Sequence, residues 1–257
     1  MRQRLIRGGL GVLVFLALAE AATRLEIIKS SVLPPMSAVV RQAVLLTADS
    51  EFLRDVWATL YVWAFGMVIT VAVGVPLGVL LGSLPAVNRA AKGIVEFLRP
   101  IPSVALVPLA IVIAQSDLGM KTTVIVYASL WPVLINTMYG MQEVDPLAKE
   151  TLRSYGFGRL AVLRRVALPS ATPFIATGVR LAASVGLILA VSAELLAGGS
   201  HGIGVFILRQ SSGIDTLDEV LAAAVWAGAI GLVVNQALIQ LERTMFRWHT
   251  VRTEAAL

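Results

Sequence analysis

The sequence predicts an all-α integral membrane protein with six transmembrane helices. Of its 257 residues, 57% are hydrophobic and only 14% are charged, and the mean hydropathy is +0.82. This composition is far more apolar than that of a typical soluble domain. Apolar runs near the roughly 20 residues needed to cross the hydrocarbon core recur along the chain. Short segments that carry most of the Lys and Arg residues separate these runs.

Charge and residue usage exclude several other classes of protein. The net charge is +5, but a nucleic-acid-binding protein gathers its basic residues on a soluble surface, whereas here they fall between apolar runs. The absence of Cys excludes disulfides, thiolate catalysis and Cys-based metal sites. His201 and His249 lie far apart in the chain, so we expect no zinc site.

The first apolar stretch, residues 8–22, is only marginally long enough to cross a bilayer. Three arginines precede it and Glu20 interrupts it. A basic start followed by small residues is also typical of a cleaved signal peptide. Between these alternatives we favour a first membrane helix, followed by a polar external connector over residues 23–54 that Pro34 and Pro35 keep from forming one helix.

The second predicted span, residues 57–84, carries a row of small residues at every fourth position. These are Gly66, Thr70, Gly74, Gly78 and Gly82. Small residues in such a row let a second helix approach closely, which is how helices gain packing energy in lipid. The row therefore predicts a helix contact rather than a ligand site.

Proline-containing apolar runs follow. The third span is predicted over 95–115, entered through Arg99-Pro100-Ile101-Pro102 and interrupted by Pro108, and the fourth over 122–141, with Pro132 inside it. Proline frees backbone carbonyls at membrane depth, and these are tolerated where protein or a polar cavity satisfies them. This favours a translocation path. The fifth and sixth spans are predicted over 173–196 and 220–241, with an external loop over 197–219 between them.

The distribution of basic residues predicts the orientation, because cytoplasmic loops carry an excess of Lys and Arg. With both ends inside, 13 of the 21 basic residues lie on the inner side: Arg2, Arg4, Arg7, Arg89, Lys92, Lys149, Arg153, Arg159, Arg164, Arg165, Arg243, Arg247 and Arg252. The outer side holds 6: Arg24, Lys29, Arg41, Arg54, Lys121 and Arg209. Arg99 and Arg180 remain near or within spans. Both termini and the loop 143–169 are therefore predicted to be cytoplasmic.

The loop 143–169 is expected to contain two short helices. Asp145 followed by Pro146 is a strong helix start, since Asp accepts free amide protons and Pro needs no donor there. The first helix should run to about Tyr155 and stop at Gly156, because Gly adopts a left-handed turn without steric cost. A second amphipathic helix with Leu160, Leu163, Val166 and Ala167 at helical spacing should follow and close at Pro169.

This loop resembles the EAA loop of ABC importer permeases. The likeness lies in Glu150-Thr151-Leu152, three further residues, Gly156, nine further residues and Val166-Ala167-Leu168-Pro169. The second and third letters of the opening triplet depart from the family pattern, and Val stands where Ile is usual. Leu98-Arg99-Pro100-Ile101-Pro102, Leu134-Ile135-Asn136-Thr137, Arg153-Ser154-Tyr155-Gly156 and Ala193-Glu194 are similar to the nitrate, taurine and aliphatic sulfonate branch.

The resemblance implies a type I ABC importer permease. Residues 1–54 would form an N-terminal membrane helix and external connector, 55–248 a permease core of five helices with the coupling loop 143–169, and 249–257 a cytoplasmic tail. Such a subunit of the cell inner membrane performs no chemistry. It moves a small solute, here a sulfonate-, taurine- or nitrate-like anion, that an external solute-binding protein delivers. The alternative is that residues 143–169 form an ordinary basic loop between membrane helices, whose charges serve only to orient the protein.

The implied partners are an ABC ATPase and a second permease copy that makes a homodimer. No GxxxxGK[ST] phosphate loop occurs in the chain, so we expect no enzyme activity and no cofactor in this subunit, with ATP and Mg²⁺ on the partner ATPase. The coupling residues implied by the resemblance are Glu150, Gly156, Leu160, Leu163, Arg164 and Pro169. An apolar face with Leu160, Leu163 and Ala167 is expected to dock in the ATPase cleft.

Polar groups in the predicted spans are candidates for lining the pathway or a gate: Gln115, Tyr127, Asn136, Thr137, Ser192 and Glu194. Each has the alternative of a helix-packing hydrogen bond. Glu194 must be paired or hydrated in lipid, either at an outer gate or as a structural partner of a helix end or of Arg209. Arg180 is expected to reach the cytoplasmic surface. The five tryptophans are expected to anchor at the membrane interface: Trp57, Trp63, Trp131, Trp226 and Trp248.

The runner-up function is a secondary transporter driven by an ion gradient. Such proteins show broken helices in repeated halves and ionisable groups inside the membrane. This chain offers Glu194 and Arg180 for that role and has no clear repeat. A membrane scaffold that transports nothing would leave the prolines and Glu194 unexplained.

Overall fold

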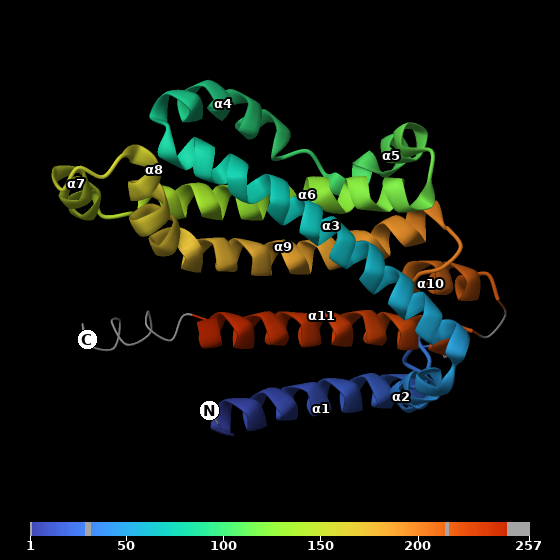
Figure 1. Cartoon of the computed structure of the whole chain (residues 1–257). Helices are drawn as coiled ribbons and strands as arrows, with labels where there is room; N and C mark the ends of the chain where they lie inside the picture. Colours follow the sequence, from blue (N-terminus) through green and yellow to red (C-terminus); the bar gives the residue numbers. More distant parts are fainter. Residues whose placement is uncertain (1, 29–31, 214–215, 246–257) are drawn as a thin grey trace. The chain divides into compact units, whose positions relative to one another are not determined.

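The computed structural model describes residues 2–28, 32–213 and 216–245, and all regular elements in those ranges are helices (Figure 1). The first seven are α1 (Arg2–Arg24), α2 (Met36–Leu45), η1 (Leu46–Ala48), α3 (Ser50–Ser83), α4 (Pro85–Leu98), η2 (Ser103–Leu106) and α5 (Val107–Ala114). The remaining seven are α6 (Asp117–Gln142), α7 (Pro146–Ser154), α8 (Arg159–Val162), the π-turn η3 (Leu163–Ala167), α9 (Leu168–Ala197), α10 (Ile203–Ser211) and α11 (Leu217–Met245).

Within the described residues, four helical runs are long and apolar enough to cross a membrane: α3, α6, the continuous run Arg159–Ala197 and α11. A fifth candidate is the bent pair formed by α4 with η2 and α5. The predicted third span over 95–115 is wrong as a straight helix, because the chain bends by 83° between Leu98 and Ser103. Pro100 and Pro102 lack the amide hydrogens that a helix requires there.

Helices also occur where the sequence suggested only connectors. The segment 23–54 contains α2 and η1, and α3 already begins at Ser50. The segment 197–219, predicted to be an external loop, contains α10. Pro108 lies in the first turn of α5 rather than interrupting a span, because a first-turn residue needs no amide hydrogen. The expected first span is helical as α1, 23 residues long, but α1 is not among the described helices that are long and apolar enough to cross a membrane.

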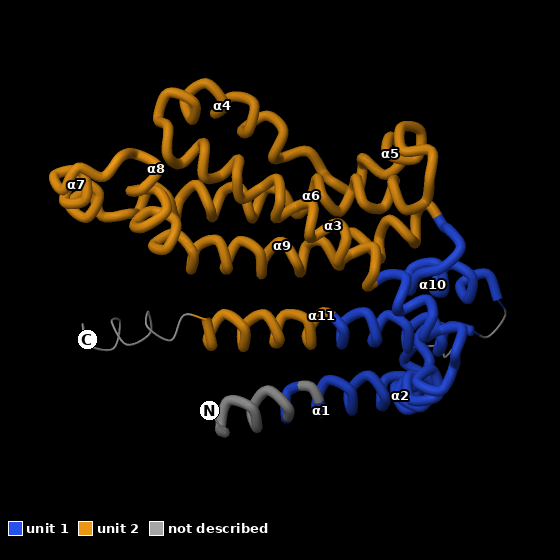
Figure 2. The backbone as a smooth tube through the Cα atoms, viewed as in Figure 1, with its two compact units in different colours: residues 1–59, 198–230 blue, residues 60–197, 231–257 orange. Residues whose placement is uncertain are grey.

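The chain divides into two compact units (Figure 2). Unit 1 comprises Met1–Thr59 and Gly198–Ile230, and unit 2 comprises Leu60–Ala197 and Gly231–Leu257. The core of unit 1 is built around Phe52, which is fully buried. Its ring lies edge-on to Phe206 at 5.0 Å and to Trp226 at 5.9 Å between centroids.

In unit 2, the row of small residues on α3 packs directly on α6. A Cβ added at four glycines of α3 would come within 3.0 Å of α6, in the pairs Gly66 with Ile125, Gly74 with Val133, Gly78 with Thr137 and Gly82 with Met141. The sequence separation is the same in every pair, so the two helices run parallel in a fixed register. The predicted helix contact is confirmed, and its partner is α6.

Helices α6 and α9 of unit 2 are equally close and run antiparallel, as Figure 1 also shows. Along α6 towards its C-terminus, Ser129, Asn136 and Gly140 meet Gly186, Gly178 and Phe174 in turn, each within 3.0 Å of an added Cβ. Ser129 Oγ also donates a hydrogen bond to the Ala182 carbonyl at 3.1 Å. Helix α6 is therefore held by backbone-to-backbone packing on two sides, by α3 and by α9.

Candidate functional site

The first helix of the loop 143–169 has a cap at each end. Asp145 Oδ1 accepts a hydrogen bond from the Leu147 amide at 2.9 Å, and Pro146 occupies the first turn of α7. At the other end, Phe157 N donates to the Leu152 carbonyl and Gly156 N to the Arg153 carbonyl, at 3.1 and 2.9 Å. Gly156 has φ +82°. These bonds form a Schellman motif, so the predicted start and the stop at Gly156 are confirmed.

The predicted end of the second helix at Pro169 is wrong. Helix α8, the π-turn η3 and α9 form one helical run from Arg159 to Ala197. Pro169 is the second residue of α9 and is exposed. Since the π-turn immediately precedes it, the helix changes its hydrogen-bonding pattern there without ending.

The apolar face expected to dock in a partner is mostly turned inward. Ala167 is only 4% exposed, in a cluster with Met141 and Val144 at the C-terminal end of α6, and Leu163 packs against the same cluster. Because this helical run continues into α9, its apolar stripe covers the core of unit 2. The prediction is therefore wrong for Ala167; for Leu163, which is half-buried, it stays a prediction, and Leu160 is 64% exposed.

Other apolar side chains of this hairpin face outward. Leu147 and Tyr155 are 68% and 80% exposed, and α7 contains no buried residue. Glu150 and Arg164 are also exposed. We name Leu147, Tyr155 and Leu160 the hairpin tip.

Two of the predicted pathway residues make hydrogen bonds to the backbone. Tyr127 OH donates to the Leu98 carbonyl at 2.6 Å. In a continuous helix that carbonyl would accept the amide hydrogen of residue 102, but Pro102 has none. At the bend this carbonyl accepts hydrogen bonds from the Ile101 amide at 3.2 Å and from Tyr127. Asn136 Nδ2 donates to the Pro132 carbonyl at 2.8 Å.

The remaining polar candidates differ in exposure. Thr137 is fully buried against Gly78, and within the described part of the chain its Oγ1 has no hydrogen-bond partner. Ser192 is half-buried on α9. Gln115 is exposed at the end of α5, with φ +50°. The structure does not gather these three residues into one cluster of contacts.

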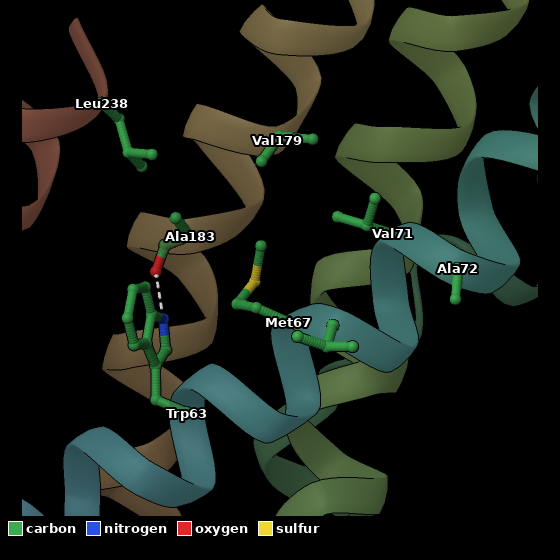
Figure 3. A pocket seen from close by; sticks show the side chains of 8 residues that line it. Trp63, Met67, Val71, Ala72, Val179, Ala183 and Leu238 are labelled. Carbon is green, nitrogen blue, oxygen red and sulfur yellow. Dashed lines mark hydrogen bonds between the residues drawn. The ribbon is translucent and has the colours of Figure 1, made fainter. Parts of the chain in front are cut away.

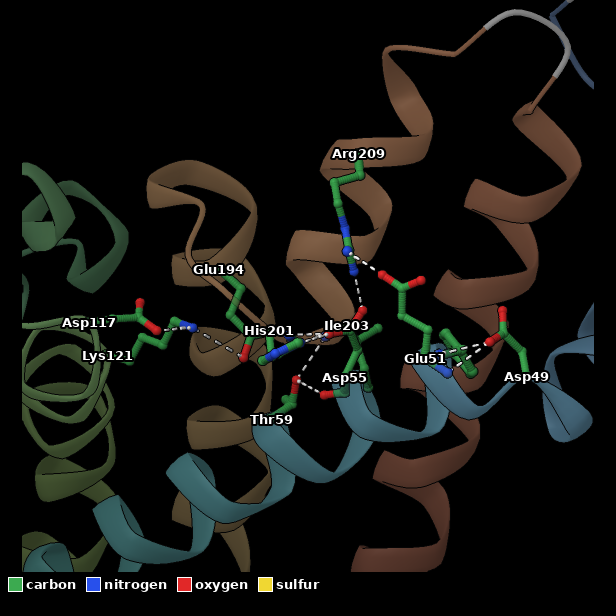
Figure 4. A network of polar contacts seen from close by, with 12 residues as sticks. Asp49, Glu51, Asp55, Thr59, Asp117, Lys121, Glu194, His201, Ile203 and Arg209 are labelled. Atoms are coloured by element: carbon green, nitrogen blue, oxygen red, sulfur yellow. Dashed lines mark hydrogen bonds and ion pairs between the residues drawn. The ribbon is translucent and has the colours of Figure 1, made fainter.

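Glu194 belongs to a buried charged group in unit 2 (Figure 4). Lys121 Nζ lies 3.0 Å from Asp117 Oδ2 and 4.0 Å from Glu194 Oε1, and the Lys121 and Glu194 side chains are 1% and 0% exposed. Lys121 was predicted to lie on the outer side, just before the fourth span; it lies in the second turn of α6 and is buried. A charged residue near a helix end need not face water when a partner carboxylate neutralises it.

A second charged cluster, in unit 1, was missed by the sequence analysis (Figure 4). Asp55 is fully buried, accepts a hydrogen bond from the Gly202 amide at 3.0 Å and lies 3.1 Å from His201 Nδ1. Arg209 pairs with Asp55 and with Glu51. Arg209 had been weighed as a partner of Glu194; its observed partners are these two carboxylates. A lone acid at the head of an apolar run was the only sequence signal.

The tryptophans are not a uniform set of interface anchors. Trp63 Nε1 donates to the Ala183 carbonyl and Trp226 Nε1 to the Ala43 carbonyl, both at 2.9 Å. Trp131 has a buried Nε1 without a partner among the described residues, and Trp57 is exposed. Trp248 and His249 lie outside the described residues, as do Lys29, Arg247, Arg252 and the expected tail 249–257.

Residues 74–245 match the family described as "Binding-protein-dependent transport system inner membrane component". The chain belongs to this family. Among curated relatives, a putative ABC transporter permease of Methanocaldococcus jannaschii is 34% identical over 186 residues, covering 71% of this chain and 68% of that protein. The bicarbonate transport system permease CmpB of Synechococcus elongatus is 30% identical, over 72% of this chain and 66% of its own. The nitrate import permease NrtB of Leptolyngbya laminosa is 30% identical, over 73% and 66%.

Solved structures give the same fold for this permease. The MetNI methionine ABC transporter matches with a TM-score of 0.62 and 19% identity, over 75% of this chain and 94% of that chain. A bacterial ABC transporter that imports the acidic polysaccharide alginate matches with a TM-score of 0.67 and 15% identity, over 95% and 97%. The predicted type I importer architecture is confirmed.

The family membership settles the broad function. The chain is a permease subunit of an ABC importer, in a family of inner-membrane transport components rather than of known enzymes. Its several apolar helices make it a multi-pass membrane protein. The alternative of an ion-gradient-driven secondary transporter finds no support among these relatives.

Proposed function

We propose that this permease passes a small inorganic or organic anion, with bicarbonate and nitrate first, from an external binding protein into the cytoplasm. The names of two relatives, a bicarbonate permease and a nitrate permease, support this substrate class. Two copies of the chain form the pathway, and a separate pair of ABC ATPases carries ATP and Mg²⁺. The excess of basic residues supports a cytoplasmic location for both termini and the loop 143–169.

The observation that carries the coupling part of this proposal is the hairpin tip. Helix α7 is capped at both ends, yet it buries none of its residues and leaves Leu147 and Tyr155 exposed beside Leu160. A helix with outward apolar side chains is suited to lie in a groove of another protein. Gly156 sets the angle between α7 and the following run through its left-handed turn, and Glu150 and Arg164 supply charges around the apolar contact.

Movement of the hairpin would reach the far end of the spans through α6 and α9. The hairpin connects the C-terminus of α6 to the N-terminus of α9. These helices are closely packed at Gly140, Gly178 and Gly186, and close packing transmits displacement with little compression. At their other ends, Lys121 and Glu194 form a buried ion pair. In this mechanism the two helices move as one lever whose outer end carries Glu194.

The outer end of this lever is suited to passing an anion along rather than binding it tightly. Lys121 is engaged by the carboxylates of Asp117 and Glu194. These carboxylates would repel an anion retained beside them. Selection between anions is therefore assigned to the binding protein, and Glu194, Gln115 and Ser192 act as gate or lining groups.

The coupling proposal is tested with paired glycine variants in proteoliposomes that hold the full permease with its ATPase. Alanine at Gly156 would meet no atom within 4 Å but would adopt φ +82°, which costs about 1–2 kcal/mol. Gly158→Ala is the control, because Gly158 has φ −69° and equally open surroundings. We expect Gly156→Ala to weaken both ATPase capture and uptake of ¹⁴C-bicarbonate or labelled nitrate, and Gly158→Ala to preserve both.

The hairpin tip is tested separately. Leu147→Ala and Tyr155→Ala should each weaken ATPase binding roughly tenfold, as expected for exposed apolar anchors of an interface. Leu241→Ala, at a comparably exposed apolar position on α11, is the control. Full ATPase capture by both tip variants would refute the docking proposal. Uptake that needs no ATP or no binding protein would refute the importer mechanism.

A further inference from the structure

Unit 2 contains a pocket of about 400 Å³ (Figure 3), and none of its lining residues belongs to the loop 143–169. Its walls come from three helices: Trp63, Met67 and Val71 on α3, Val179 and Ala183 on α9, and Leu238 on α11. Val68, which also lines it, is 68% exposed, so the pocket opens onto the surface of the unit. Its volume is within the range of small-molecule sites, roughly 300–1,000 Å³.

The chemistry of the walls excludes a polar ligand. Every lining side chain is apolar apart from the indole nitrogen of Trp63, and that nitrogen already donates to the Ala183 carbonyl at 2.9 Å (Figure 3). An anion or a water molecule in this pocket would leave its hydrogen-bonding groups unsatisfied, at a cost of several kcal/mol. The pocket is therefore no part of an anion pathway and accepts only hydrocarbon.

A polar pair marks the pocket's edge. Glu242 stands one helical turn beyond Leu238 on α11, and Arg180 directly follows Val179 on α9. Arg180 Nη1 lies 3.6 Å from Glu242 Oε2, with 30% and 25% of the two side chains exposed, and Thr177 Oγ1 lies 3.5 Å from Glu242 Oε1. All three helices are long and apolar enough to cross a bilayer. A partly exposed charge pair near the end of the apolar part of α11 is expected at the level of lipid headgroups.

We propose that this pocket binds one acyl chain of a zwitterionic phospholipid of the phosphatidylethanolamine type, with its headgroup at Arg180 and Glu242. The headgroup phosphate is complementary to the guanidinium and the ammonium to the carboxylate, so a zwitterion satisfies both charges where an anionic lipid satisfies one. The acyl chain fills the space between α3, α9 and α11. This site shares no residue with the hairpin tip or with the group around Lys121 and Glu194.

The first test measures lipid retention by native mass spectrometry of the permease in mild detergent, after mixing with dioleoyl phosphatidylethanolamine or dioleoyl phosphatidylglycerol. Val71→Phe places a ring in the pocket, and Val73→Phe, at a 42% exposed position outside it, is the matched control. We expect one phosphatidylethanolamine per chain in the wild type and in Val73→Phe, and its loss in Val71→Phe. Equal retention by the two variants would overturn the site.

Two arginine variants test the headgroup. Arg180→Gln should lower phosphatidylethanolamine retention about tenfold, the expected effect of losing a charge-assisted hydrogen bond. Arg243→Gln, at an exposed arginine in the last turn of α11, should leave retention unchanged. If both variants retain the lipid equally, or if phosphatidylglycerol binds as well as phosphatidylethanolamine, the headgroup assignment is wrong.

A fluorescence measurement separates a bound lipid from a protein partner. The Trp63 signal is the difference between the wild type and Trp63→Phe in nanodiscs. We expect phosphatidylethanolamine with brominated acyl chains to quench this signal, and Val71→Phe to reduce the quenching. If the brominated lipid leaves the Trp63 signal unchanged, another protein surface, such as a second permease copy, covers the pocket. That result overturns the proposal, and it needs only the wild type and Trp63→Phe, so it holds even if Val71→Phe folds poorly.

Discussion

The tight contact between α3 and α6 makes a sharp prediction for Gly78. In a Gly78→Ala variant the added Cβ would lie 2.6 Å from Thr137 Cβ, 2.8 Å from Thr137 Cγ2 and 2.9 Å from the Leu134 carbonyl oxygen. Ordinary carbon contacts are about 3.5–4.0 Å. One of these atoms is backbone, so a rotamer change of Thr137 does not relieve the clash. The two helices must separate by about 1 Å.

The magnitude follows from what this separation costs. A gap of about 0.5–1 Å forfeits a quarter to a half of the dispersion energy of each contact it opens, and the contacts at Gly74 and Gly82 open together with that at Gly78, because they share one register. Overpacking of this kind destabilises by about 1–3 kcal/mol. Alanine has a higher helix propensity than glycine, which offsets up to about 1 kcal/mol of this destabilisation. We expect a net loss of about 1–2 kcal/mol in the free energy of unfolding.

The assay is an unfolding titration of the purified permease in bicelles, and Gly93 supplies the matched control. A Cβ added at Gly93, in the helix interior of α4, meets nothing within 4 Å. Gly93→Ala should therefore stabilise the protein by up to about 1 kcal/mol through helix propensity alone. The two substitutions are chemically identical and should have opposite signs. If Gly78→Ala were as stable as Gly93→Ala, the close approach of α3 and α6 would be refuted.

Two further predictions concern buried polar groups. Lys121→Met removes the cation paired with the buried Glu194 and should lower the free energy of unfolding by about 3 kcal/mol. Adding Glu194→Gln should recover part of this loss. Strictly additive effects in a double-mutant cycle would contradict an interaction between the two residues. Tyr127→Phe removes the hydroxyl that donates to the Leu98 carbonyl and should lower the free energy of unfolding by about 1 kcal/mol. Tyr139→Phe, at a 53% exposed position, is the control and should leave it unchanged. Equal melting temperatures of the two variants would show that the Tyr127 hydrogen bond does not stabilise the bend.

Much of the fold follows from local patterns in the chain. Apolar runs of sufficient length located α3, α6, α9 and α11, because the bilayer demands that length wherever it is crossed. The start of α7 at Asp145 and Pro146 and its stop at Gly156 were also predictable. Each depends on the chemistry of one or two neighbouring residues, an amide acceptor, a missing donor or a left-handed turn, and needs no tertiary contact.

The errors occur where a residue's role depends on a distant partner. Nothing in the sequence predicted that Lys121 is buried, because the carboxylate of Glu194 that pairs with it comes from another helix. Ala167 has the right spacing for a docking face, but spacing shows only that a helix has an apolar face and not what covers it. The observed cover is the cluster around Met141 at the end of α6.

By itself, the sequence determined that this chain is an integral membrane protein, that a capped polar hairpin lies between two of its apolar helices, and that α3 has a row of small residues for close helix contact. Only the tertiary structure decided that α6 is the partner of that face, that Tyr127 donates to the Leu98 carbonyl at the bend, and that the hairpin's second helix continues into α9. The physical reason is the range of the forces involved. Propensity, capping and hydropathy act between neighbours in the chain, whereas packing, ion pairing and carbonyl satisfaction require groups that only folding brings together.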